Sequence, residues 1–323
     1  MSRPISIPSA VNRAFAGWPP AVLDPAGPYA GSITVLTWLL FAIALLVIAV
    51  VGAALWIALR GKARTRKRLG GTKLIWTAGI AFPVLVLTLL LIYGLRLTSS
   101  LSAGAGPVSD LRVRVTGEMW WWRVAYLDRQ GKVIAWDANE LHIPAGRTVL
   151  LELESADVIH SFWVPRLSGK TDMIPGRRNL MKIQANAPGV FPGQCAEYCG
   201  GPHALMGFVV VAERPADFAR FLGKLARPAP PGNSPDRRLF ETVGCAACHR
   251  IAGTPANGMA GPDLTFVGAR RTLGAGILPN NHGTLMGWIG DSQAIKPGNR
   301  MPPFSMLTSE QLDSLARYLE ERK

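Results

Sequence analysis

The chain has 323 residues, of which 49% are hydrophobic, and its formal net charge at pH 7 is +14. This length is typical of about two domains, and the hydrophobic content favours a membrane protein. Most of the basic excess lies before residue 100, in a cluster between two apolar runs. That pattern indicates membrane topology, and no nucleic-acid partner is expected. The cluster comprises Arg60, Lys62, Arg64, Arg66, Lys67, Arg68 and Lys73.

The first hundred residues predict a leading segment followed by a hairpin of two transmembrane helices. Residues 1–31 are rich in proline and show no apolar run behind a basic start, so no cleavable signal peptide is expected. Residues 32–59 and 74–96 are almost wholly apolar. At about 1.5 Å per residue, each run is long enough to cross a bilayer. The basic loop 60–73 is expected in the cytoplasm, so residues 1–31 and everything after the second span face outward.

Residues 97–226 predict a small antiparallel β-barrel or sandwich. Apolar and polar residues alternate from Leu111 to Thr116, which is the period of a half-buried strand. Further β-rich runs, separated by proline and glycine, follow at 123–127, 149–153, 158–164 and 208–211. A proline-rich linker at 227–234 then leads to a helical domain at 235–323.

The stretch from Cys195 to Met206 carries four soft or borderline metal ligands: Cys195, Cys199, His203 and Met206. Thiolate, imidazole and thioether groups together favour copper over hard cations. His160, upstream on a predicted strand, supplies a second imidazole. Two thiolates can bridge two copper ions, with Met206 as a weak axial ligand of one and the backbone carbonyl of Glu197 as that of the other. Such a site transfers electrons and leaves no open position for substrate. A closed zinc site is the alternative.

The sequence C-A-A-C-H at 245–249 is the attachment pattern of covalently bound haem c. Cys245 and Cys248 are expected to hold the porphyrin through thioethers, with His249 as an axial iron ligand. Met301, in the run N-R-M-P-P-F, is the best candidate for the sixth ligand; the others are Met259, Met286 and Met306. A redox-active disulfide is the alternative, but it predicts a βαβ context that this sequence pattern lacks.

With these motifs, the chain resembles subunit II of a haem–copper cytochrome c oxidase, of the bacterial type with a fused C-terminal cytochrome c domain. The resemblance covers essentially the whole chain. It implies a multi-domain fold: a two-helix transmembrane hairpin, an all-β cupredoxin-like Greek-key domain and an all-α class I cytochrome c domain. It also implies that the copper pair is a binuclear CuA centre, held by His160, Cys195, Glu197, Cys199, His203 and Met206.

The resemblance implies roles for residues outside the ligand sets. The Glu197 carboxylate is implied to bind a Mg or Mn ion shared with subunit I, and the segment from Lys170 to Arg177 to face that subunit. Trp120 stands at the usual electron-entry position, whereas plain packing is an even alternative for Trp121 and Trp122.

In the haem domain, the resemblance implies that Pro262 packs at the haem edge and Trp288 lies near a propionate. Two positions depart from the family pattern. Lys73 stands where a glutamate is usual, which puts the usual contribution to proton entry in doubt. Glu118 stands where histidine or another polar residue is common, and no mechanism is attached to it.

The function implied by the resemblance is that of the electron-transfer subunit of a proton-pumping terminal oxidase in the bacterial inner membrane. Haem c would accept electrons from a donor such as a cytochrome bc complex or a soluble periplasmic redox protein. They would pass through the copper pair to haem in subunit I, where oxygen is reduced to water. Subunit III and membrane lipid are further expected partners. The input subunit of a CuA-containing nitric oxide reductase, and a copper-binding or copper-delivery module, are the alternatives.

Overall fold

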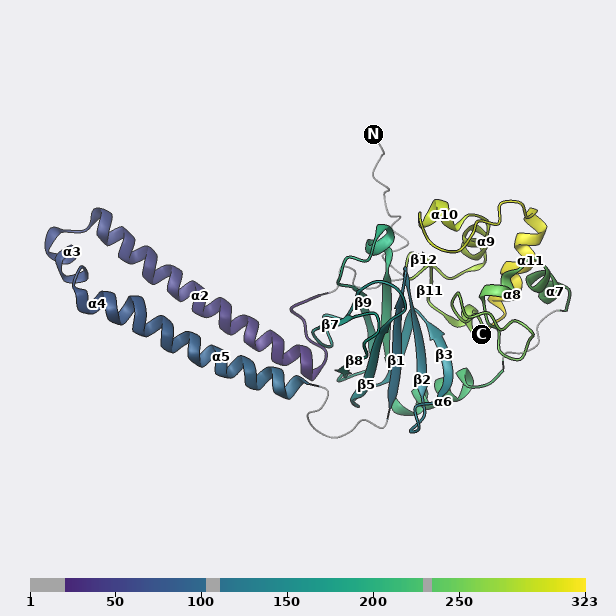
Figure 1. The fold of residues 1–323 in the computed structure, drawn as a ribbon, viewed down its shortest axis with the longest axis horizontal. Helices are drawn as coiled ribbons and strands as arrows, with labels where there is room; N and C mark the ends of the chain where they lie inside the picture. The colour runs from purple at the N-terminus through teal and green to yellow at the C-terminus, as the bar shows by residue number, and fades with distance from the viewer. Residues whose placement is uncertain (1–20, 103–110, 229–233) are drawn as a thin grey trace. The chain divides into compact units, whose positions relative to one another are not determined.

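The computed structural model describes residues 21–102, 111–228 and 234–323, which Figure 1 colours along the chain. They form two compact units, one spanning Gly31–Pro107 and the other containing the rest. Most of the predicted leading segment 1–31 lies outside the described residues. So do residues 229–233 of the predicted linker.

The smaller unit is a pair of apolar helices joined by short helical turns (Figure 1). Two helical stretches, Pro28–Arg60 and Thr72–Leu101, are long and apolar enough to cross a membrane, with mean hydropathies of 2.9 and 2.4. Both extend beyond the predicted spans 32–59 and 74–96. The second contains a π-helical turn, and Pro83 follows it in the first turn of α5, where a missing N–H is tolerated. The elements are α2 (Pro28–Arg60), α3 (Ala63–Leu69), α4 (Thr72–Trp76), the π turn η1 (Thr77–Ala81) and α5 (Phe82–Leu101).

In the larger unit, two five-stranded sheets form a β-sandwich, with strand orders β3-β2-β1-β5-β8 and β4-β10-β9-β6-β7. Most neighbouring strands are antiparallel, but β1 pairs with β5, and β10 with β4, in parallel. The predicted antiparallel sandwich is therefore confirmed for most strand pairs but not for these two, where the chain crosses between the sheets before returning to pair. The strands are β1 (Arg112–Glu118), β2 (Trp121–Leu127), β3 (Val133–Ala138), β4 (Glu140–Pro144), β5 (Val149–Ser155), β6 (His160–Trp163), β7 (Lys170–Met173), β8 (Asn179–Ile183), β9 (Gly189–Cys195) and β10 (Gly207–Glu213).

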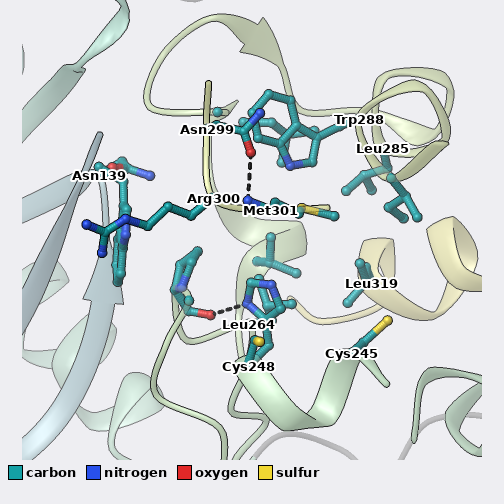
Figure 2. A pocket seen from close by; sticks show the side chains of 18 of the residues that line it. Asn139, Cys245, Cys248, Leu264, Leu285, Trp288, Asn299, Arg300, Met301 and Leu319 are labelled. Carbon is teal, nitrogen blue, oxygen red and sulfur yellow. Dashed lines mark hydrogen bonds between the residues drawn. The ribbon is translucent and has the colours of Figure 1, made fainter. Parts of the chain in front are cut away.

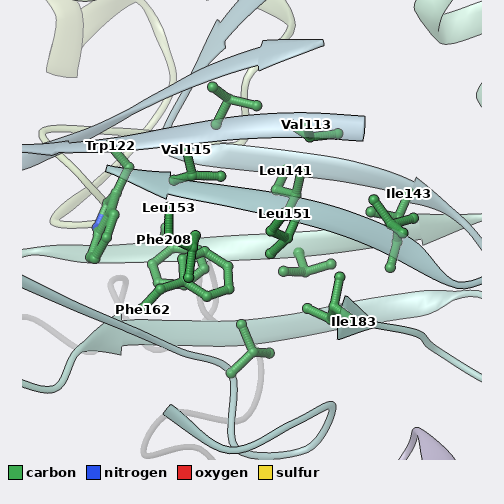
Figure 3. Close-up of a cluster of buried hydrophobic side chains, with 14 of the residues drawn as sticks. Val113, Val115, Trp122, Leu141, Ile143, Leu151, Leu153, Phe162, Ile183 and Phe208 are labelled. Carbon is green, nitrogen blue, oxygen red and sulfur yellow. The ribbon is translucent and has the colours of Figure 1, made fainter. Parts of the chain in front are cut away.

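The sandwich is held together by apolar side chains that point between its sheets (Figure 3). On β1, Val113 and Val115 are buried while Arg112 and Arg114 lie on the other face, as the period of two requires. Trp122 lies in this core and packs edge-on against Phe162, so the packing interpretation of this tryptophan is confirmed. Helix α6 (Pro215–Leu225) follows β10 and was not predicted.

The C-terminal part of the larger unit is mostly helical and has its own apolar core. Capping boxes begin α9 and α11: the Asn281 and Thr308 side chains each accept a hydrogen bond from a backbone N–H three residues on. A short strand pair, β11 (Thr272–Leu273) with β12 (Leu278–Pro279), interrupts the helices. The helical elements are α7 (Ser234–Thr242), α8 (Cys245–Cys248), η3 (Val267–Ala269), α9 (His282–Gly290), α10 (Ser292–Ile295) and α11 (Ser309–Glu320).

Candidate functional site

The predicted copper ligands converge at one end of the β-sandwich. The Cys195 and Cys199 sulfurs are 3.8 Å apart, and both thiols are free. Nδ1 of His160 lies 3.9 Å from Sγ of Cys195, and Nδ1 of His203 lies 3.5 Å from Sγ of Cys199. Sδ of Met206 is 3.8 Å from Sγ of Cys199. Each sulfur thus faces one imidazole, and the thioether lies beside one of them.

Strand pairing explains why residues separated in sequence meet here. His160 begins β6 and Cys195 ends β9, and these two strands are antiparallel neighbours. The chain then passes through a short 3-10 turn, η2 (Gly201–Leu205), before β10 begins. The backbone N–H of Cys195 donates to the carbonyl of Met206 at 3.1 Å, which closes the loop at its base. The donor set is therefore fixed by a strand, a strand end and a closed loop.

The electrostatics of this cluster suit a thiolate metal site. Cys199 donates a hydrogen bond that lowers the pKa of Cys195 to about 3, with further help from His160. Conversely, its contact with the Cys195 thiolate raises the pKa of Cys199. These shifts favour a thiolate at Cys195, and a bound cation would favour ionisation of the second thiol as well. Soft sulfur and imidazole donors buried together fit copper better than a hard cation.

Asp157 is a residue of this site that was not predicted from the sequence motifs. One of its carboxylate oxygens lies 2.9 Å from Nε2 of His160, on the far side of the ring from Cys195. Burial disfavours a charged His160, but its contacts with Cys195 and Asp157 raise its pKa overall. This carboxylate fixes which nitrogen of His160 carries the proton, so Nδ1 faces the sulfurs. The three-residue spacing D-V-I-H was the available signal.

The backbone carbonyl and the side-chain carboxylate of Glu197 lie in different surroundings. Its backbone carbonyl oxygen lies 3.2 Å from Sγ of Cys195, so it is positioned to add a further donor to the cluster. Its carboxylate is 45% exposed and 3.6 Å from Nζ of Lys170. Lys170 also pairs with Asp172 at 3.0 Å. This group of charges lies on the surface beside the cluster.

Trp120 lies between the predicted copper ligands and a cavity in the C-terminal part of the chain. Its indole N–H donates to the carbonyl of Cys199 at 2.9 Å. Gly200 has φ +111, and a Cβ there would lie 3.1 Å from the Trp120 ring, so the loop approaches this ring closely. Trp120 also lines the cavity that contains Cys245, Cys248 and His249.

That cavity has a volume of about 390 Å³ and brings the predicted haem residues together. Cys245 and Cys248 lie on one helical turn, α8, and His249 follows it. Figure 2 shows the Met301 side chain entering the cavity opposite the turn that carries the two cysteines. Pro262 and Trp288, predicted at the haem edge and near a propionate, also line the cavity. The sites proposed from motif spacing are thus spatially coherent.

The residues of this cavity fit a haem ligand set. Nδ1 of His249 is 2.8 Å from the carbonyl oxygen of Pro262, to which it can donate, leaving Nε2 available for iron. Burial lowers the pKa of His249, which favours the neutral imidazole that a metal requires. A Cβ at Gly261 would lie 2.5 Å from the His249 ring, so only glycine allows this close approach. Burial also raises the pKa of Cys245 to about 11.

A polar network holds the Met301 loop. Oδ1 of Asn299 accepts from the Met301 backbone N–H at 2.8 Å (Figure 2), and the Gln293 side chain donates to the Met301 carbonyl at 2.8 Å. Arg300 directly precedes Met301, and its side chain points away from Met301 towards Asn139 in Figure 2. Its guanidinium lies 3.2 Å from the second carboxylate oxygen of Asp157.

Several predicted positions lie away from both donor sets. Glu118, for which no mechanism was predicted, pairs with Arg123 at 2.6 Å and lines the cavity that contains Cys245 and Cys248. Trp121 also lines that cavity, and Arg123 lies over its ring at 4.7 Å. Lys73 is exposed on α4. His142 and His282 each pair with carboxylates outside the two donor sets.

Comparisons with known proteins match the chain in two separate regions. A family model described as cytochrome c oxidase subunit II, periplasmic domain, matches residues 132–213, and one described as cytochrome c matches residues 237–323. A relative from Bacillus sp. (strain PS3), named cytochrome c oxidase subunit 2, is 32% identical over 272 residues, covering 78% of this chain and 74% of its own length.

Two further similar proteins match a smaller share of this chain. The cytochrome c oxidase subunit 2 of Alkalihalophilus pseudofirmus is 38% identical over 215 residues, and the matched region spans 65% of this chain and 61% of that protein. The crystal structure of the periplasmic domain of cytochrome oxidase subunit II from Bradyrhizobium japonicum shares 31% identity. It covers 37% of this chain and 95% of that structure, with a TM-score of 0.34.

Proposed function

The chain belongs to the cytochrome c oxidase subunit II family, and we propose that it is the electron-input subunit of a terminal oxidase. In this proposal its haem domain takes electrons from an external donor, and its copper domain delivers them to a partner subunit that reduces oxygen to water. The donor is a cytochrome bc complex or a soluble periplasmic redox protein, and the partner assembly includes subunits I and III and pumps protons.

Each cofactor would be held by the residues that converge in its site. Cys245 and Cys248 would bind haem covalently, and His249 and Met301 would supply ligands to its iron. A copper pair would be held by the six residues identified above: His160, Cys195, Glu197 through its carbonyl, Cys199, His203 and Met206. When bound, the two groups supply one-electron oxidation and reduction.

The observation that carries the proposal is the position of Trp120. Its indole N–H binds the carbonyl of a predicted copper ligand, Cys199, while the same residue lines the haem cavity. A single side chain therefore joins the surroundings of the two cofactor sites. Buried donors that need little rearrangement favour electron transfer over substrate chemistry. This supports a relay function for the chain.

The surface beside the copper site suits contact with the partner subunit. The carboxylate of Glu197 is half-exposed and lies beside Lys170 and Asp172. Carboxylate oxygens suit a hard cation such as Mg²⁺ or Mn²⁺. We assign this group to the subunit I interface, where a shared cation would take ligands from both chains.

The apolar helices anchor the chain in the cytoplasmic membrane. Seven basic residues occupy residues 60–73, between the two long apolar helical stretches. The excess of lysine and arginine in a short loop favours a cytoplasmic position. The copper and haem domains then lie on the periplasmic side, in contact with the external donor.

Purification of the complex from native membranes tests the proposal. Metal and haem analysis should give two coppers and one covalently bound haem c per copy of this chain. Oxygen uptake should be sensitive to cyanide. Zinc in place of copper would contradict the proposed site. Consumption of nitric oxide without oxygen uptake would instead assign the chain to a nitric oxide reductase.

A further inference from the structure

Lys296 is a buried lysine at the junction between the haem domain and the copper domain. It follows α10 and is 2% exposed. Its ammonium donates to the carbonyl oxygens of Trp120 at 2.7 Å, Leu205 at 2.9 Å and Gly274 at 3.0 Å. Three N–H donors thus meet three acceptors, which satisfies the hydrogen-bonding capacity of the protonated side chain.

Removing this ammonium from water carries a large desolvation free energy, which its contacts must offset. Among the residues that the structure describes, no carboxylate forms a salt bridge with Lys296. Burial lowers its pKa to about 7, in the direction expected for a lysine removed from water. Buried lysines without an ionic partner are rare. A full set of carbonyl acceptors offsets part of the desolvation cost.

The three acceptors belong to segments that serve both cofactor sites. Trp120 contacts the Cys199 carbonyl and the haem cavity. Leu205 lies between His203 and Met206, in the loop from Cys195 to Met206 that carries most of the predicted copper ligands and is called the copper loop below. Gly274 lies in the β11–β12 turn of the haem domain, where a Cβ would come within 2.9 Å of the Trp288 ring. One ammonium therefore ties together the tryptophan, the copper loop and the wall of the haem cavity.

Neighbouring contacts show that the haem domain rests on this same surface. The backbone N–H of Gly207 donates to the carbonyl of Ala275 at 3.1 Å. Ala275 follows the Lys296 acceptor Gly274 directly, and Gly207 lies two residues after the acceptor Leu205. Arg270 forms a buried ion pair with Asp137 at 2.8 Å. These contacts hold the domains together around Lys296 but do not reach Trp120 or Leu205.

We propose that Lys296 is a positioning residue that locks the haem domain onto Trp120 and the copper loop, and so sets the rate of haem-to-copper electron transfer. The inference rests on the proposed function. In that step the haem iron loses one electron and the copper pair gains one, with no bond made or broken. A purely stabilising lysine would affect folding or cofactor content, but not the transfer rate in a fully loaded protein.

The test compares three variants of the purified full complex. Lys296→Met removes all three donors at similar length, and Lys296→Gln keeps two. Lys132→Met is the matched control, since Lys132 is an exposed residue in the β2–β3 turn. The haem-to-copper rate is measured after rapid photochemical reduction of haem c. Haem and copper content and both midpoint potentials are determined on the same samples.

Hydrogen exchange followed by mass spectrometry provides a readout that does not depend on cofactor activity. It is performed on the full chain, with and without copper. Peptides that cover residues 119–122, 203–207 and 272–276 report on the three segments joined by Lys296. Peptides from the β5 core report on the fold itself, because β5 is buried in the sandwich.

The expected result is a rate at least about tenfold lower in Lys296→Met, with a smaller loss in Lys296→Gln and none in Lys132→Met. Cofactor content and potentials should not change, and exchange should increase only in the three junction segments. Unchanged rate and exchange in Lys296→Met would overturn the proposal. If a variant fails to load its cofactors, hydrogen exchange still tests the proposal. Faster exchange confined to the three junction segments supports the lock, and faster exchange throughout β5 overturns it. If the wild-type complex transfers no electron from haem to copper, the proposed function fails, while exchange still tests the lock.

Discussion

His142 offers a quantitative test of how the β-sandwich depends on pH. Its imidazole lies between two carboxylates, with Nδ1 3.3 Å from Glu213 and Nε2 3.7 Å from Glu140. It also stacks on Phe221 of α6 at a ring separation of 3.8 Å. Burial lowers the pKa of His142, but the two carboxylates outweigh it and raise the pKa to about 9 from 6.5. At about 1.36 kcal/mol per pKa unit, this is equivalent to ~3 kcal/mol of folding free energy.

The sign of the effect follows from the raised pKa. Protonation is stronger in the folded chain than in the unfolded chain, so the stabilisation is complete below pH 6.5 and is lost as pH rises through about 9. His142→Gln removes the charge, so the difference in stability between wild type and variant should be large at pH 6 and should shrink by ~3 kcal/mol by pH 9.5. For a domain of this size, that corresponds to roughly 10 °C in melting temperature.

Scanning calorimetry of the purified chain in detergent, from pH 6 to pH 9.5, measures this difference. Glu213→Gln is the informative companion variant, because it removes one of the two carboxylates while keeping the side-chain shape. It should shift the loss of stability to lower pH. Melting temperatures of wild type and His142→Gln that fall in parallel across this range would refute the reasoning, since His142 would then contribute no pH-dependent stability.

Three further substitutions test the cofactor sites. Met206→Leu should leave a copper centre with an altered potential and slower onward transfer, because a weak axial thioether is lost; an unchanged spectrum and rate would count against Met206 as a ligand. Met301→Leu should retain covalently bound haem but change the absorption spectrum, since one axial ligand is removed, and an unaltered spectrum would point to another methionine. Gly261→Ala should reduce haem incorporation, because its Cβ would lie 2.5 Å from the His249 ring; normal haem content measured by pyridine haemochrome would contradict this.

Local sequence patterns were sufficient to predict which candidate donors lie close together, but not the residues that surround them. Cys195, Cys199, His203 and Met206 lie within one loop, so their spacing alone indicated a common site. His160 could be added because it lies on a predicted strand and supplies a second imidazole. By contrast, Lys296 approaches Trp120 from 176 residues away in sequence, and its acceptors are backbone carbonyls that any residue type provides.

The fold was predictable to the same extent. Hydrophobic runs and alternation gave the helices and several strands, because burial imposes those periods directly. The parallel pairing of β1 with β5 depends on where the chain crosses between sheets, which residue alternation does not encode. The C-terminal domain was expected to be helical throughout, and its short β11–β12 pair carries one of the carbonyls that Lys296 binds.

The closed base of the copper loop has an evolutionary consequence. Because Cys195 and Met206 are hydrogen-bonded neighbours at the ends of β9 and β10, the chain leaves and re-enters the sandwich at one place. Insertions, deletions or exchanges between these two residues should therefore change the donor set while leaving the pairing of β9 with β10 in register. The residues between Cys195 and Met206 can thus vary separately from the scaffold, which keeps His160 in place on β6.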